Sequence, residues 1–349
     1  MIDIKQILNE LTAVQAISGD EKNLTRLLKT KMTPLVDEFV YDNLGSIYGI
    51  KKSNTSNAPK VMLTGFLDES GFVVKEIKDN GLIKALVIGD IKADNIVGSK
   101  VYIQKETQAI DGIILHSPFE KLKGEVIIDF GFSSKDEAIS FDVDYGDSIS
   151  FCVTGYTSIN QKQFFGKAIR RSYGSLQLLN VLSELKDTDL PFDLYVGGTV
   201  LNQVGNRGAQ TATNLVKPDL AITFDVLPAS KKVSDSSEVQ GKLGEGALIT
   251  YYDRSILPNR SLTKLMTSTC HEKGINTQPY FSMQSSDAGW IHKLRIGTPT
   301  LLINVAGTNL DYSLNGVHIK DIEDALNATV SIIEKLTTMD IHSFKEENR

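Results

Sequence analysis

Two aspartates that follow apolar, strand-like runs are the residues of this chain best suited to binding a metal ion. Asp68 stands in VMLTGFLDESGF, and Asp225 closes PDLAITFD. Carboxylate oxygens are good ligands for divalent cations, so the two acids could hold one ion weakly. Arg170, in GKAIRR, offers a planar cation that pairs with carboxylates through two parallel hydrogen bonds. We therefore expect a salt-bridged or hydrated group of side chains in preference to a metal ion, in which Arg170 pairs with Asp225, Asp311 or both.

Other polar residues could in principle supply a nucleophile or a ligand. Residues 285–292, SSDAGWIH, contain two serines, an aspartate and a histidine, but no Gly-x-Ser-x-Gly turn surrounds the serines. His318 could replace a metal ligand, yet none of the histidines are spaced four residues apart as on a zinc-binding helix. Gly205 and Gly208 match neither a dinucleotide-binding nor a P-loop pattern. We interpret all of these residues as structural.

The elements that must position these side chains alternate between helices and strands. Residues 3–35 have apolar residues at helical spacing, interrupted by SGDE, in which Ser18 and Glu21 have the spacing of a capping box. From residue 161 onward, apolar strand-like runs alternate with amphipathic helices, which predicts an α/β layered domain with a largely parallel sheet. The predicted helices of this part are residues 175–186, 260–274 and 320–336.

The stretch from about residue 71 to residue 160 has a different pattern. Short alternating apolar runs are separated by turn residues, which predicts a small β-barrel or sandwich. One segment, SSKDEAISF, interrupts the pattern and predicts a short helix capped by Ser133 or Ser134. The simplest architecture is one α/β domain, residues 1–70 and 161–349, interrupted by an inserted β-rich domain, residues 71–160.

The composition excludes several classes of protein. The 349 residues carry a net charge of −6 without a cluster of basic residues, which argues against nucleic-acid binding. No stretch approaches the roughly 18 apolar residues of a membrane span, and the amino terminus does not resemble a signal peptide. The two cysteines, Cys152 and Cys270, lie far apart without metal-type spacing. We therefore expect a protein of the cytoplasm without disulfide bonds.

Nine segments in order along nearly the whole chain resemble the glutamyl-aminopeptidase and tetrahedral-aminopeptidase family of dinuclear metallopeptidases, an endoglucanase-like aminopeptidase family. The chain is identified on this resemblance as a degenerate member of the family. The segments are ISGDEKNL at 17–24, DNLGSI at 42–47, VMLTGFLDESGF at 61–72, IDFGFSSKDEA at 128–138, GKAIRR at 166–171, TVLNQVGNRGA at 199–209, PDLAITFD at 218–225, SSDAGW at 285–290 and GTPTLLINV at 297–305.

The resemblance implies a peptidase domain with an inserted β domain that serves dimer formation, and dimers that can assemble into hollow tetrahedral dodecamers. It also implies a site with two divalent ions, zinc or cobalt, and a bridging water as the nucleophile. Such a site needs ligands that lower the pKa of the bound water and a carboxylate that accepts its proton.

The chain departs from the family at the positions that the resemblance assigns to the metals. The family's His-x-Asp triplet reads Phe66-Leu67-Asp68 here, and a phenyl ring has no lone pair to donate. Arg170 stands in place of the aspartate that bridges the two metals. A guanidinium at that place would repel a divalent cation.

The remaining family positions change as well. The glutamate that acts as general base and the ligand glutamate beside it are replaced by Asn202 and Gln203, whose amides accept no proton at neutral pH. Asp225 is the same residue type as the family's aspartate ligand, whereas Asp311 stands in place of the final histidine ligand. Asp225, Asp311 and Arg170 together carry a charge of −1, whereas the family's carboxylates carry −4 against two divalent ions.

From these departures we expect a non-catalytic homologue of the metallo-aminopeptidases that acts in assembly or regulation and has no cofactor. Its expected partner is a second copy of itself, in a dimer or a larger oligomer, or an active paralogue. Two alternatives remain open. One is an active aminopeptidase or other hydrolase with a rebuilt site. The other is a module that binds peptides or amines in the old cleft through Asp68, Asp225 or Asp311.

Overall fold

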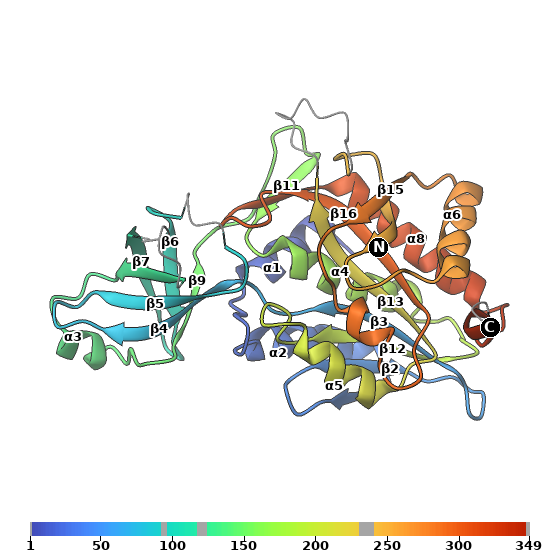
Figure 1. Ribbon diagram of the computed structural model, residues 1–349, viewed down its shortest axis with the longest axis horizontal. Coiled ribbons are helices and arrows are strands. Elements are labelled where there is room, and N and C mark those ends of the chain that lie inside the picture. The colour runs from blue at the N-terminus through green and yellow to red at the C-terminus, as the bar shows by residue number, and fades with distance from the viewer. Residues whose placement is uncertain (1, 92–95, 117–123, 230–240, 347–349) are drawn as a thin grey trace.

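Two β-structures organise the chain, a large mixed sheet and a small closed barrel (Figure 1). The computed structural model describes residues 2–91, 96–116, 124–229 and 241–346. Within these residues the large sheet has eleven strands and the barrel has six. Figure 1 shows the barrel at one end of the long axis of the molecule, beside the α/β body that contains the large sheet.

The central strands of the large sheet are parallel, and antiparallel strands flank them. The order is β1-β2-β12-β3-β13-β16-β17-β11-β10, in which β12, β3, β13 and β16 are parallel, and β14 and β15 extend the sheet beside β16. The strands are β1 (Glu38–Tyr41), β2 (Ile47–Lys51), β3 (Lys60–Phe66), β10 (Tyr156–Thr157), β11 (Gln163–Gly166), β12 (Asp193–Thr199), β13 (Leu220–Pro228), β14 (Ala247–Asp253), β15 (Thr277–Ser282), β16 (Thr300–Thr308) and β17 (Asn315–His318).

Helices cover both faces of the central strands, which explains why those strands are apolar along their whole length. The face with the larger core is covered by α1 (Ile4–Ala13), α2 (Lys22–Met32), α4 (Ile169–Glu184), α6 (Arg260–Lys273) and α8 (Ile319–Leu336). The opposite face is covered by α5 (Arg207–Val216) and α7 (Ala288–Ile291). A 3₁₀ turn, η1 (Thr33–Leu35), follows α2, and α9 (Ser343–Glu346) lies near the carboxyl end.

One close approach fixes the helix that carries the site against the sheet. A Cβ atom added to Gly65 of β3 would lie 2.9 Å from the Cα of Gly174 in α4. Glycine at both positions therefore lets α4 lie directly on β3, and this contact places the first turn of α4 over the end of that strand.

The barrel has its own apolar core, since alternate residues of its strands point inward. Its strands are ordered β4-β5-β8-β7-β6-β9. The Ser134 hydroxyl accepts a hydrogen bond from the Glu137 N–H at 3.2 Å and caps the short helix. The elements are β4 (Gly71–Ile77), β5 (Ile83–Ile88), β6 (Lys100–Gln104), β7 (Ala109–His116), β8 (Glu125–Asp129), α3 (Lys135–Ser140) and β9 (Ser148–Phe151).

The predicted fold class, an α/β body with an inserted barrel, is confirmed. Parallel pairing is restricted to the centre of the sheet and the β14–β15 pair, because short connections such as the one between β1 and β2 form antiparallel hairpins. The predicted capping box is wrong: the Glu21 carboxylate accepts hydrogen bonds from the N–H groups of Gly19 and Leu201 instead. In the described part of the chain, no helix is long and apolar enough to span a membrane.

Candidate functional site

The seven residues that the sequence singles out gather at the carboxyl ends of the central parallel strands. Phe66 ends β3, Asn202 and Gln203 follow β12, Asp225 lies in β13, and Arg170 stands in the first turn of α4. Carboxyl ends of parallel strands meet at one edge of a sheet, where α/β proteins commonly bind ligands. A cavity of about 50 Å³ at this edge is lined by Phe66, Asp68, Arg170, Gln203 and Asp311, together with residues of the neighbouring loops.

An ion pair between Arg170 and Asp225 occupies the centre of the site. Arg170 donates from Nε to Asp225 Oδ1 at 3.0 Å and from Nη2 to Asp225 Oδ2 at 2.7 Å. The Phe66 ring lies against the guanidinium, with its centroid 5.4 Å from Cζ. Burial alone would lower the pKa of Arg170, but the Asp225 carboxylate, together with the charges of Asp311 and Asp90, raises it. The guanidinium therefore stays charged and engages both oxygens of Asp225.

Asp68 is fully buried and bonded to the loop that follows β12. Its Oδ1 accepts from the Asn202 N–H at 2.9 Å, and its Oδ2 accepts from the Gln203 N–H at 2.8 Å. Burial raises the pKa of Asp68, although these two hydrogen bonds oppose the shift. Asp68 thus holds the backbone of the Asn202–Gln203 turn in place.

The amide of Asn202 faces a second buried acid, whereas the amide of Gln203 faces Ser70. Asn202 donates from Nδ2 to Asp287 Oδ1 at 2.8 Å, and the Thr199 hydroxyl donates to Asp287 Oδ2. Gln203 accepts from the Ser70 hydroxyl at 2.9 Å. Burial raises the pKa of Asp287 to about 6, and the charges of Asp68 and Asp225 add to that shift.

Sequence reasoning missed three acids of this site. Asp287 and Asp253 line one small cavity with Asp225, and burial raises the pKa of both residues. Burial also raises the pKa of Glu21 to about 7. Asp253 closes the strand-like run LITYYD, as Asp225 closes its own run, and this shared position is the signal that could have found it. The sequence offers no comparable signal for Asp287, which was interpreted as structural.

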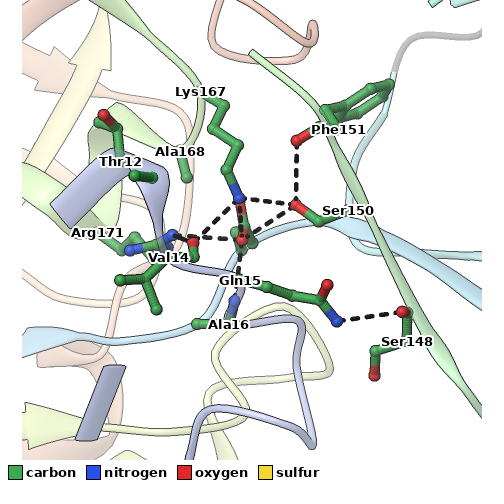
Figure 2. Close-up of polar contacts among 12 residues, drawn as sticks. Thr12, Val14, Gln15, Ala16, Ser148, Ser150, Phe151, Lys167, Ala168 and Arg171 are labelled. Atoms are coloured by element: carbon green, nitrogen blue, oxygen red, sulfur yellow. Dashed lines mark hydrogen bonds and ion pairs between the residues drawn. The ribbon is translucent and has the colours of Figure 1, made fainter. Parts of the chain in front are cut away.

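A second buried cluster joins the site to the barrel (Figure 2). Glu69 Oε1 accepts from Lys167 Nζ at 2.8 Å, from Arg171 Nη2 at 3.2 Å and from the Ala16 N–H at 3.0 Å. Lys167 also donates to the hydroxyl of Ser150, on barrel strand β9, at 2.7 Å. Burial lowers the pKa of Lys167 to about 8, and the neighbouring Arg171 adds to this shift. We call these residues (Glu69, Ser150, Lys167 and Arg171) the buried joint.

An α/β body interrupted after β3 by a closed barrel, with polar residues gathered at its strand ends, is the architecture of a class of aminopeptidases. A family model described as M42 glutamyl aminopeptidase matches residues 45–327, so the chain belongs to the M42 family. The chain is 29% identical over 347 residues to the glutamyl aminopeptidase of Lactococcus lactis subsp. cremoris, covering 96% of this chain and 97% of that protein. It is 26% identical over 355 residues to the putative aminopeptidase FrvX of Escherichia coli, covering 98% of each chain.

Solved structures of similar fold agree with this membership. A TET aminopeptidase from the marine sediment archaeon Thaumarchaeota archaeon SCGC AB-539-E09 superposes with a TM-score of 0.90 at 28% identity, covering 98% of this chain and 99% of its own. The TET1 peptidase of Pyrococcus horikoshii, which can assemble into a tetrahedron or a large octahedral shell, has a TM-score of 0.84 at 22% identity. It covers 95% of this chain and 99% of its own, and its likeness shows the fold.

Family membership corrects the prediction that the chain has no cofactor. M42 aminopeptidases depend on two metal ions, so that prediction is wrong for a chain of this family. At the strand ends, however, the side chains as arranged do not fit two ions, because Arg170 engages both oxygens of Asp225. Among the described residues, no group of three or more His, Cys, Asp or Glu side chains is placed to hold a metal. We therefore assign no chemical step to a metal at this site.

Proposed function

We propose that this protein is a non-catalytic M42 homologue that acts through assembly. The observation that carries the proposal is the ion pair in which Arg170 engages both oxygens of Asp225. By the family resemblance, Arg170 stands where a bridging carboxylate would be needed, and Asn202 stands where a general base would be needed. An amide accepts no proton at neutral pH, so the attacking water has no base at that position.

Donors of the protein engage two further acids of the site, Asp68 and Asp287. Both oxygens of Asp68 accept backbone N–H groups, and both oxygens of Asp287 accept side-chain donors. These donors oppose the rise in pKa that burial causes, and thereby lower the basicity of both carboxylates toward a water molecule. This engagement of the carboxylates favours the non-catalytic function over a hydrolase with a rebuilt site.

The test combines activity and metal content. The purified chain is incubated with excess zinc or cobalt, the bound metal is measured by mass spectrometry, and Glu-, Asp- and Leu-p-nitroanilides are supplied as substrates. We expect no turnover above the blank, whatever metal the protein carries. Turnover by the parent protein that Asp225→Asn abolishes would refute the proposal.

A matched variant tells an inactive site from an unsuitable substrate. The quadruple variant Phe66→His, Arg170→Asp, Asn202→Glu and Gln203→Glu puts back four of the five residue types that the resemblance implies, and Asp311 stays a carboxylate, which can itself bind a metal ion. If it cleaves one of the anilides while the parent protein does not, the four positions account for the missing activity.

The proposed assembly is a homo-oligomer, or a hetero-oligomer with an active paralogue, in the cytoplasm. We propose that residues 71–160 form the inserted β-rich dimerisation domain and that residues 1–70 and 161–349 form the aminopeptidase-like domain. Apolar side chains exposed on the barrel, such as Ile139 and Tyr145, support an assembly surface there. Sedimentation equilibrium of the purified chain tests the homo-oligomer, and a monomer at all concentrations would refute it.

A peptide ligand in the old cleft is a second candidate function. The ligand's ammonium group would bind Asp68, Asp225 or Asp311; Asp68 and Asp311 line the cavity at the strand ends, where four acids outnumber the three cations Lys167, Arg170 and Arg171. Thermal unfolding with short peptides measures this, because a ligand that binds only the folded state raises the melting temperature.

A further inference from the structure

A groove on the outer side of α6 is open to solvent. It has a volume of about 1000 Å³ and lies between α6 and the ends of strands β14 and β15. Figure 1 shows α6 at the outer edge of the α/β body. The inner side of α6 packs on α8 and β14 through buried residues such as Leu262 and Met266. The groove therefore lies on the side of the helix that faces away from the core. We call it the α6 groove.

The two walls of the α6 groove differ in polarity. One wall is apolar: the rings of Tyr251 and Phe281 stack with centroids 6.0 Å apart, and both are exposed. Leu257, which also lines the groove, is 75% exposed. The other wall is a polar stripe of α6, whose lining residues recur three or four positions apart from Arg260 to Glu272. Exposed aromatic and aliphatic side chains gathered beside a polar rim mark a protein interaction surface.

The polar wall carries positive charge. Arg260 and Lys264 are exposed, and within the described residues neither forms an ion pair. Glu272 also lines the groove, but its carboxylate is paired with Lys335 of α8 at 2.6 Å. Arg260 stands in the first turn of α6, where the backbone N–H groups add positive partial charge. Acidic side chains of a ligand would therefore be attracted to this wall.

The length of the polar wall suits a helix of another chain. From Arg260 to Glu272 the wall is about 18 Å long, which a second helix of roughly three turns would match. The described helices of this chain do not offer such a ligand, because Ile139 of α3 is their only exposed large apolar residue. The six residues of α3 span about 9 Å, half of the wall.

We propose that the α6 groove binds an amphipathic, acidic helix of another protein. The bound helix lies alongside α6, with leucine or phenylalanine side chains against Tyr251 and Leu257 and with glutamates or aspartates beside Arg260 and Lys264. In the described part of the chain, the α6 groove and the cavity at the strand ends share no lining residue. This binding therefore does not depend on whether the strand-end site is catalytic.

Two synthetic peptides test the docking. The acidic peptide has about 14 residues, with leucine or phenylalanine at every third or fourth position and glutamate on the flanking positions. The basic peptide has lysine in place of each glutamate. Both carry fluorescein, and binding to the purified chain is followed by fluorescence anisotropy at low salt, because salt screens exposed charges. We expect saturable binding of the acidic peptide and roughly tenfold or more weaker binding of the basic peptide.

Variants of each wall identify the surface that binds. Arg260→Glu with Lys264→Glu should bind the acidic peptide roughly tenfold or more weakly than the parent protein and should bind the basic peptide more tightly. A misfolded variant could not show this gain. Tyr251→Ser with Leu257→Ser removes two exposed apolar side chains and should also weaken binding of the acidic peptide roughly tenfold.

The control variant, Arg26→Glu with Lys186→Glu, reverses two exposed charges outside the α6 groove and should bind like the parent protein. Equal binding of both peptides by the parent protein, the absence of saturable binding, or parent-like binding by the charge-reversed groove would overturn the proposed docking. Sedimentation equilibrium tests a second copy as the occupant: weaker self-association of the charge-reversed variant would assign the groove to that copy and overturn the docking. A parent protein that stays monomeric and binds the acidic peptide would support the docking and refute the homo-oligomer.

Discussion

Removal of the Arg170 side chain measures how strongly the central ion pair stabilises the fold. Arg170→Met keeps an unbranched apolar chain but leaves the Asp225 carboxylate, whose side chain is only 8% exposed, without its cation. Breaking a buried ion pair costs about 3–5 kcal/mol. Because the Arg170 side chain is 23% exposed, water compensates part of that loss. We expect the free energy of unfolding to fall by about 2–3 kcal/mol.

The assay is unfolding in urea, followed by the fluorescence of Trp290, the one tryptophan in the sequence. Arg170→Met with Asp225→Asn removes both charges and should lose less stability than Arg170→Met alone, since no buried charge stays unpaired. Arg26→Met changes an exposed arginine of α2 and should stay within about 0.5 kcal/mol of the parent protein. If Arg170→Met is as stable as the parent, or if the double variant loses the sum of both single losses, the ion pair does not stabilise the site.

Three further substitutions test other parts of the structure. Burial raises the pKa of Asp287 from 3.8 to about 6, so its stabilising contribution is complete below about pH 3.8 and is lost as the pH rises through 6. Asp287→Asn should therefore be about 1–2 kcal/mol more stable than the parent protein in urea unfolding at pH 7.5, and it should lose that advantage at pH 3.8. An equal difference in the free energy of unfolding at both pH values would contradict this expectation. Glu69→Gln leaves two buried cations without their anion, so the free energy of unfolding, measured by thermal unfolding, should fall by about 3–5 kcal/mol. The control Glu76→Gln changes an exposed residue and should have little effect. Equal melting temperatures of the two variants would refute the expectation. Ser134→Ala removes the cap of α3 and should cost about 1 kcal/mol, whereas Ser133→Ala should not, and the same loss in both variants would contradict this assignment.

The sequence predicts well those features that depend on local pattern. Continuous apolar runs predict the buried central strands, alternating runs predict the barrel, and a serine before charged residues predicts the cap at Ser134. The capping box predicted at Ser18 and Glu21 does not form, because the N–H of Leu201, which is distant in sequence, donates a hydrogen bond to the Glu21 carboxylate instead. Local spacing cannot show such competition.

The residues of the site also fall into two groups, those that the sequence indicates and those that only the tertiary structure brings in. A family resemblance, rather than spacing, places Arg170 beside Asp225, and the structure contains that ion pair. Asp253 and Asp287 belong to the site only through burial and through contacts with strands that are distant in sequence. An aspartate in a loop-like segment such as SSDAGW has the same local appearance whether it is solvated or enclosed. Their raised pKa values therefore follow from the tertiary structure alone.

The buried joint couples the barrel mechanically to the centre of the site. Lys167 and Arg171 flank Arg170 in the chain, and both are anchored to Glu69, which directly follows Asp68. Force applied at the far end of the barrel therefore acts on the first turn of α4 and on the end of β3 through these hydrogen bonds. Mechanical load on the barrel and the geometry of the Arg170–Asp225 pair are coupled through the same few residues.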